Sequence, residues 1–100
     1  MGRTAEHVYT AQADIRRLES LVAELPTNGH VRLRLRDGDL CDGVISERPN
    51  VQMFRDPDEN EGINGVVHLE RPAVPGWSRY VWLDQIAAVE HLDSTLGGES

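Results

Sequence analysis

Hydrophobic residues in the first quarter of the chain recur with the period of an α-helix. Six apolar positions are separated by steps of three and four residues, which places them on one stripe of a helix. They are Val8, Ala11, Ile15, Leu18, Val22 and Leu25. Thr4 is a suitable N-cap, and Pro26 disfavours helix at the residue before it. The pattern predicts a helix over residues 5–25, whose stripe either covers its own domain or pairs with a second copy.

The period changes to two after the Asn28-Gly29 turn. Apolar Val31, Leu33 and Leu35 alternate with Arg32, Arg34 and Arg36, so residues 30–36 form a strand with one buried face. A turn at residues 37–39 leads into a second strand at residues 40–47.

The length of that turn decides which face of the second strand is buried. A two-residue turn would place Asp42 opposite Leu33 on the buried face, whereas a three-residue turn directs Cys41, Gly43 and Ile45 inward. We expect the three-residue turn, with Asp42 opposite Arg34 on the outer face.

Short apolar runs separated by turn residues continue to the end of the chain. They predict strands at residues 51–55, 65–71, 79–83 and 86–92, a loop at residues 56–62 and a flexible tail at residues 93–100. The chain is therefore expected to be mainly β. An N-terminal helix precedes a five- to six-stranded, strongly bent antiparallel sheet that forms a small closed or nearly closed barrel.

Two segments resemble the motifs of the Sm-like family, which includes the bacterial Hfq branch. The run Val31-x-Leu33-x-Leu35-x-Asp37-Gly38, followed by Gly43 and Ile45, is similar to the first Sm motif. The run Val81-Trp82-Leu83-Asp84-Gln85-Ile86-x-x-Val89 is similar to the second. The resemblance implies a single domain over residues 1–92 with the Sm-like variant of the SH3-like barrel, an insertion at residues 56–77, and a divergent bacterial branch of the family.

The residues that such proteins use for RNA are mostly replaced. Arg48-Pro49-Asn50 and Met53 stand where an acidic residue and an asparagine are usual, and Trp82-Leu83-Asp84 stands where Hfq has Tyr-Lys-His. Family members bind RNA as rings of six or seven subunits. The resemblance thus implies a non-catalytic, oligomeric binding module of unassigned ligand; the alternative is an Hfq-like RNA-binding protein in post-transcriptional regulation.

One row of basic residues is the candidate for nucleic-acid contact. Arg32, Arg34 and Arg36 lie on one strand face, where they could follow a phosphate backbone while Trp82 stacks on a base. The competing interpretation is a solvated face that Asp39 and Asp42 partly neutralise.

Charge and composition limit the classes of binding partner that we expect for this chain. Seventeen acidic residues against ten basic ones give a net charge of −7, which opposes coating of nucleic acid. The single cysteine, Cys41, suits a reducing cytoplasm, and no apolar run has the length of a membrane span. We expect a cytoplasmic homo-oligomer, with single-stranded RNA as the alternative partner and neither DNA nor a membrane.

The remaining motifs do not indicate catalysis or a cofactor. Asp56, Asp58 and Asn60 begin like a calcium loop, but Glu61 and Val67 stand where that loop needs glycine and glutamate. The four histidines have no ligand spacing, and Cys41 is expected to be an inert core thiol. No metal, cofactor or catalytic residue is predicted.

Overall fold

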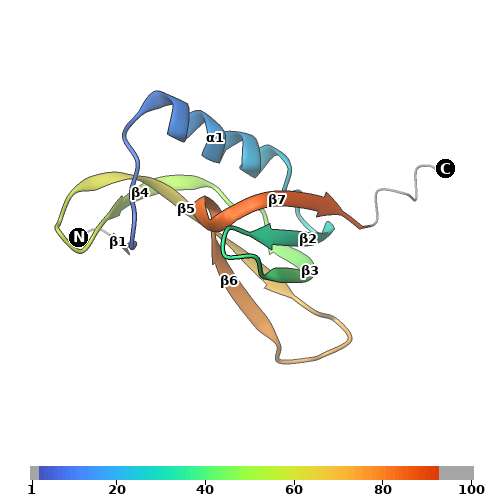
Figure 1. Ribbon diagram of the computed structural model, residues 1–100. Coiled ribbons are helices and arrows are strands. Elements are labelled where there is room, and N and C mark those ends of the chain that lie inside the picture. Colours follow the sequence, from blue (N-terminus) through green and yellow to red (C-terminus); the bar gives the residue numbers. More distant parts are fainter. Residues whose placement is uncertain (1–2, 93–100) are drawn as a thin grey trace.

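One helix and one bent sheet make up the protein, of which a computed structural model describes residues 3–92 (Figure 1). In chain order the elements are β1 (Arg3–Thr4), α1 (Gln12–Ala23), β2 (His30–Leu35), β3 (Leu40–Glu47), β4 (Val51–Arg55), β5 (Glu61–Glu70), β6 (Ser78–Trp82), the 3₁₀ turn η1 (Leu83–Gln85) and β7 (Ile86–His91). The predicted helix followed by a bent antiparallel sheet is thus confirmed, with six strands after the helix. The predicted tail at residues 93–100 lies outside the described residues.

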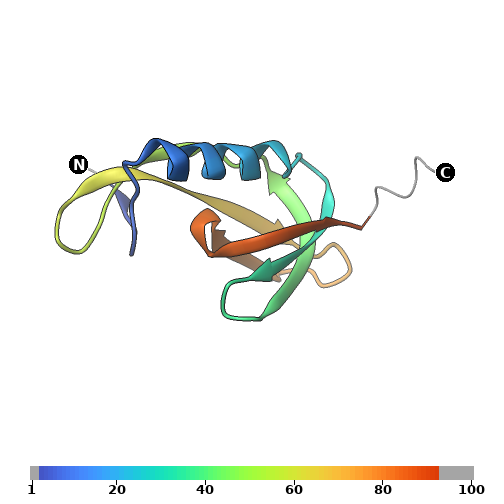
Figure 2. The same cartoon turned by 45° about the horizontal axis from the view of Figure 1, so that its top comes forward.

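Strand β5 is the centre of the sheet. Neighbouring strands follow the order β1-β4-β5-β3-β2-β7, and β6 also pairs with β5. The first half of β5 pairs with β4, and its second half pairs with both β3 and β6. All pairs except β1–β4 are antiparallel. The sheet curls beneath α1, so that the helix closes one side of the barrel (Figure 2).

The core lies between α1 and the curled sheet. Apolar side chains of the helix, its C-terminal extension and the alternate positions of five strands form one buried cluster. It consists of Leu18, Leu21, Leu25, Val31, Leu33, Leu35, Cys41, Ile45, Val67, Leu69, Val81, Leu83 and Ile86. Because β2, β3 and the second half of β5 each bury every other residue, their opposite faces are left for solvent or partners.

The helix is shorter than the predicted span of residues 5–25. It begins at Gln12, with Ala11 rather than Thr4 at the N-cap. The preceding residues give their backbone groups to the sheet instead: Ala5 N–H donates to Arg55 O at 3.0 Å, and Tyr9 exchanges two hydrogen bonds with Ile63. The apolar period through Val8 was misleading, because the residues before Ala11 form an extended segment that pairs with β4 and β5 through Ala5 and Tyr9.

The β2–β3 hairpin has the predicted buried face but a different register. Cys41, Gly43 and Ile45 are buried, as the three-residue turn requires. Leu35 N–H bonds to Asp39 O at 2.9 Å, so the three turn residues are 36–38 rather than 37–39. Gly38 in this turn has φ +94°, which favours glycine. The earlier closure places Asp42 opposite Arg32, not Arg34.

Residues 56–77 are not a simple insertion. Their largest part is β5, which starts at Glu61 and is the central strand of the sheet. β4 and the first half of β5, joined by residues 56–60, form a projecting hairpin that we call the arm (Figure 1). The second connection, residues 71–77, is held by Arg71, whose guanidinium lies 4.0 Å from the centre of the Trp77 ring and 3.2 Å from Asp42.

Candidate functional site

The three arginines of the predicted row do not share one environment. Arg36 lies beyond the end of β2, where its Nε donates to Asp84 O at 2.7 Å and its backbone N–H donates to Gln85 O at 2.8 Å. These bonds tie the β2–β3 turn to η1, so Arg36 has a structural role. Only Arg32 and Arg34 remain on the outer face of β2.

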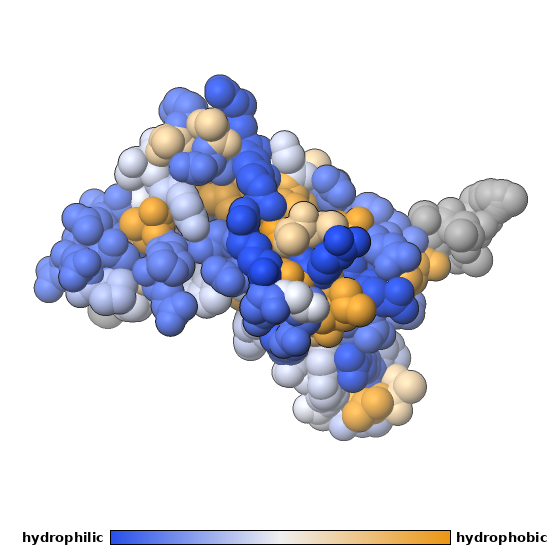
Figure 3. Space-filling view, viewed as in Figure 1, coloured by the Kyte–Doolittle hydropathy of each residue, from blue (hydrophilic) through white to orange (hydrophobic). Residues whose placement is uncertain are grey.

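Arg32 and Arg34 border a shallow depression that we call the arginine hollow. It has a volume of about 460 Å³ and is lined by Arg32, Arg34, Leu40, Ala88, Val89 and Glu90. Arg32 is paired with Glu90 at 3.2 Å, whereas the Arg34 side chain makes no ion pair or hydrogen bond within residues 3–92. Leu40 is 62% exposed. Over β2, β3 and β7, Figure 3 shows strongly hydrophilic side chains next to apolar ones.

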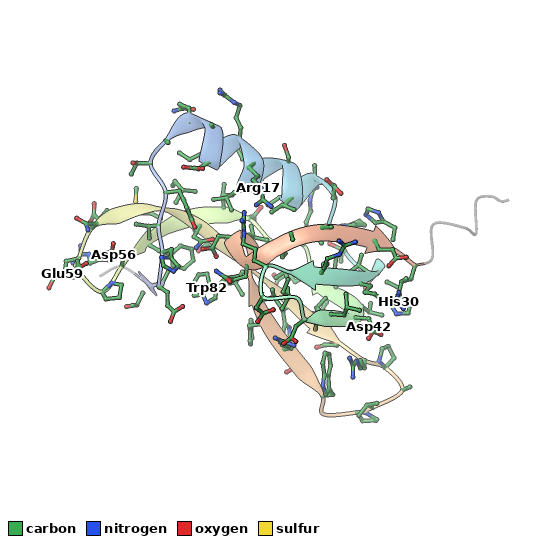
Figure 4. All side chains as sticks on the ribbon, in the orientation of Figure 1. Arg17, His30, Asp42, Asp56, Glu59 and Trp82 are labelled. Carbon is green, nitrogen blue, oxygen red and sulfur yellow. The ribbon has the colours of Figure 1, made fainter. Side chains whose placement is uncertain are left out.

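Trp82 lies away from the arginine hollow. It is half-buried at the end of β6, and its ring meets Phe54 edge-on, with centroids 5.1 Å apart and an interplanar angle of 76°. This contact joins the end of β6 to Phe54, near the loop end of β4; Figure 4 labels Trp82. Trp82 does not line the hollow, so the structure separates the predicted stacking residue from the predicted phosphate contacts.

A second aromatic pair lies on the outer face of β5 and β6. His68 and Tyr80 stand opposite each other in the register, and their rings stack with centroids 4.3 Å apart. Ser46 Oγ lies 2.7 Å from His68 Nδ1, which fixes the imidazole. Tyr80 is 69% exposed and borders a depression of about 320 Å³ that also contains Arg48.

The sequence indicated the position of Tyr80 but not that of its partner His68. Tyr80 and Trp82 are two residues apart in a strand, so both had to lie on one face. The partner His68 is placed by the β5–β6 register, which depends on the length and geometry of the connection at residues 71–77. No spacing within the chain specifies that register.

Asp84, which stands in place of a basic residue of Hfq, is buried and structural. It is 5% exposed, and its Oδ2 accepts a hydrogen bond from the Tyr9 hydroxyl at 2.9 Å. Burial, this hydrogen bond and the negative charge of Asp84 raise the pKa of Tyr9 to about 12. The phenol therefore stays protonated and keeps donating to the carboxylate at neutral pH.

The loop that resembles a calcium site is held together by its own hydrogen bonds. Asp56 Oδ1 accepts from the backbone N–H groups of Asp58 and Asn60 at 3.0 and 2.8 Å. The hydrogen bond from the Asn60 backbone N–H is the largest of the causes that lower the pKa of Asp56.

Across the described part of the chain, no three His, Cys, Asp or Glu side chains are grouped so as to hold a metal ion. Among the same residues, α1 and the 3₁₀ turn are too short and too polar to cross a membrane.

The sheet has three open edges among the described strands, of which β6 and β7 are the longer ones. β6 pairs with β5 on one side only, and β7 pairs with β2 on one side only. At the other end of the strand order the edge strand is the two-residue β1, which pairs with Phe54 and Arg55 of β4. Unpaired backbone groups on an edge strand are a template for another strand.

An N-terminal helix over a curled sheet of six antiparallel strands, with the two motif segments in β2–β3 and β6–β7, defines an Sm-like protein. The chain belongs to the family described as a domain of unknown function (DUF3247), whose model matches residues 2–92. It is also similar to XC5848 from Xanthomonas campestris, whose crystal structure adopts a novel variant of the Sm-like motif. The two chains are 37% identical, with a TM-score of 0.85, and the match covers 92% of this chain and 99% of XC5848. No curated protein matches the sequence significantly.

Proposed function

We propose that the protein is a non-catalytic Sm-like module that assembles with copies of itself through the open edges of β6 and β7. The observation that carries this proposal is that β6 and β7, strands of five and six residues, each leave one side unpaired among the described strands. Because the two edges differ, their pairing is head-to-tail, and such contacts build rings when the rotation closes.

The backbone of β7 supports pairing on its outer side. Leu92 N–H bonds to His30 O at 2.9 Å, and bonded and non-bonded pairs alternate along an antiparallel ladder. Val89, opposite Leu33, therefore directs its N–H and C=O away from β2. These groups are available to a neighbouring strand.

Helix α1 lies beside β7, and the contacts between them determine the width of the space that separates the two elements. Arg17 donates to Ile86 O at 2.8 Å near the start of β7, and His91 Nε2 donates to Glu24 O at 2.6 Å near its end. Between the two contacts a groove remains. It is lined by Arg17, Ser20, Leu21, Glu24, Ala87, Ala88 and Val89. Small side chains on β7 leave its backbone accessible from the groove.

The opposite edge, β6, carries exposed side chains along most of its length. Val81 is its one buried residue, while Ser78, Arg79 and Tyr80 are exposed. A strand of this composition is stable at an edge, yet its outer backbone groups satisfy their hydrogen bonds with water alone. Pairing with β7 of a neighbour replaces those water contacts.

The test is a proline at the outward-facing backbone position of β7. Val89→Pro removes an N–H that makes no bond with any residue from 3 to 92, so the variant folds but does not pair. Val89→Thr keeps the N–H and the β-branched shape and is the matched control. We expect light scattering at micromolar concentration to show oligomers for the wild type and Val89→Thr, and monomers for Val89→Pro. A wild-type protein that stays strictly monomeric contradicts the proposal, as does an oligomeric Val89→Pro.

Single-stranded RNA is the second candidate function, and the exposed His68–Tyr80 stack with Arg48 beside it favours this possibility. Base stacking on an exposed ring and a nearby cation are the elements of sequence-tolerant RNA binding. The remaining outward arginines, Arg32 and Arg34, would add phosphate contacts elsewhere on the surface.

Titration of labelled single-stranded RNA at low and moderate salt tests this candidate. We expect binding that weakens steeply with salt, falls in Tyr80→Ala and Arg48→Ala, and weakens further when Arg32 and Arg34 are also replaced by alanine. Arg36 is left in place because its bonds to η1 are structural. Absence of binding at low salt eliminates RNA as the ligand.

A further inference from the structure

The arginine hollow combines one unpaired cation with exposed apolar surface. Arg32 is already neutralised by Glu90, so Arg34 supplies the only unpaired positive charge that lines the hollow. Next to it, Leu40 is 62% exposed. An apolar centre with charges at its border is typical of a contact between proteins. A nucleic acid needs several cations along its backbone, and the hollow offers one unpaired cation, so the hollow fits it less well.

The tip of the arm has the complementary charge. Asp58 and Glu59 lie at its end, and neither carboxylate has a partner within residues 3–92. The third acid of the loop, Asp56, is occupied with bonds to Asn60 and Asp58, and Glu61 is paired with Arg55 at 2.8 Å. The tip thus presents two unpaired negative charges on a loop that its own hydrogen bonds hold in shape.

The arm cannot deliver this tip to the hollow of its own chain. The hairpin is paired without interruption from Val51–Gly65 to Arg55–Glu61, and β1 supports its outer side. Figure 4 shows Asp56 and Glu59 at the far end of the arm and Asp42 on the opposite side of the molecule. Asp42 belongs to β3, the strand whose first residue, Leu40, lines the hollow. A partner for the tip must therefore come from another molecule.

We propose that the arginine hollow receives the acidic arm tip of a second copy of this chain, with Asp58 or Glu59 facing Arg34. This inference rests on the proposed self-association and names a contact that orients the copies. A net charge of −7 makes copies repel one another, so an interface between them requires local pairing of opposite charges. The contact is head-to-tail, as is the pairing of β6 with β7.

A charge-swap experiment on the full chain tests this contact. Arg34→Glu and Asp58→Arg are each expected to weaken self-association by about tenfold or more, because a close interfacial charge pair becomes a repulsive one. The double variant Arg34→Glu/Asp58→Arg restores opposite charges and is expected to recover most of the lost affinity. Arg16→Glu, on the exposed side of α1, changes the net charge as Arg34→Glu does but outside the hollow, and is the control for that variant. Sedimentation at several salt concentrations measures the association constants.

The outcomes separate this inference from the proposed function. If Arg34→Glu and Asp58→Arg assemble like the wild type while Val89→Pro is monomeric, the arm contact is wrong and edge pairing stands. If the single variants weaken assembly but the double variant does not recover, Arg34 and Asp58 do not face each other; Glu59→Arg, combined with Arg34→Glu, then decides whether the tip is the occupant. A monomeric wild type overturns both proposals.

Discussion

The Tyr9 hydroxyl donates a hydrogen bond to Asp84 Oδ2 at 2.9 Å, across 75 positions of the chain. This bond joins the segment before α1 to the 3₁₀ turn between β6 and β7. Tyr9 also exchanges two backbone bonds with Ile63 of β5. A single residue therefore anchors the N-terminal segment to both the central strand and the second motif segment.

We predict that Tyr9→Phe destabilises the protein by about 1–2 kcal/mol. The substitution keeps the ring but leaves the buried Asp84 carboxylate without this donor, and an unsatisfied buried acceptor costs about that much. Urea denaturation measures the change. Tyr80→Phe, which alters an exposed phenol, is the control and should leave the midpoint nearly unchanged.

The same bond predicts sensitivity to alkaline pH. The pKa of Tyr9 is raised from 10.0 to about 12, so at pH values between these the unfolded chain loses a proton that the folded chain keeps. Stability that is fully present below pH 10 is therefore lost as the pH rises toward about 12. Melting curves across this range should fall more steeply for the wild type than for Tyr9→Phe. Equal slopes would show that Tyr9 does not titrate in this way.

We predict that Gly65→Ala destabilises the base of the arm. A Cβ at this position would lie 2.6 Å from Leu83 Cδ1 and 2.8 Å from Asn50 O, and the backbone oxygen cannot move aside without disturbing the start of β4. Overpacking of this kind costs about 1–3 kcal/mol. Thermal or urea unfolding measures it, with Ser78→Ala on the exposed edge strand as the control. A melting temperature equal to that of the wild type would contradict the contact.

Asp56 is predicted to order the tip of the arm. Because its pKa is lowered by the backbone bond from Asn60, its side chain-to-backbone bonds persist above the ordinary value of 3.8 and are lost as the pH falls through the folded-state value. Asp56→Ala should speed amide hydrogen exchange at Asp58 and Asn60 without changing exchange in the core strands. Asp58→Ala should leave the Asn60 amide protected. Unchanged exchange in Asp56→Ala would exclude this role.

The most accurate predictions from sequence were those with a strict period and a marked turn. Alternation from Val31 to Leu35, with the Gly38 turn, specified one buried face, and the structure buries the same side chains. The helical period was less reliable. It ran through Val8, in a segment whose backbone pairs with β4 and β5 at Ala5 and Tyr9, because an apolar spacing does not report which partner accepts the backbone hydrogen bonds.

The candidate site was predicted only in part, since a surface is assembled from distant strands. Arg32 and Arg34 lie together on the outer face of β2, as their alternation required. Arg36 was separated from them because the turn closes one residue earlier and η1 accepts its guanidinium. The His68–Tyr80 stack was missed because it depends on the β5–β6 register.

The amino-acid sequence by itself determined the class of this protein: an apolar stripe, a change of period from 3.6 to 2 and the glycine-marked turns are local properties, and they select a helix followed by a bent antiparallel sheet. Tertiary structure alone decided which outward side chains meet. Which strands lie at an edge, which side chains line the arginine hollow and where the arm ends all depend on pairing between strands far apart in the chain. Strand register, rather than the spacing of residues along the sequence, decides which of these side chains lie close together.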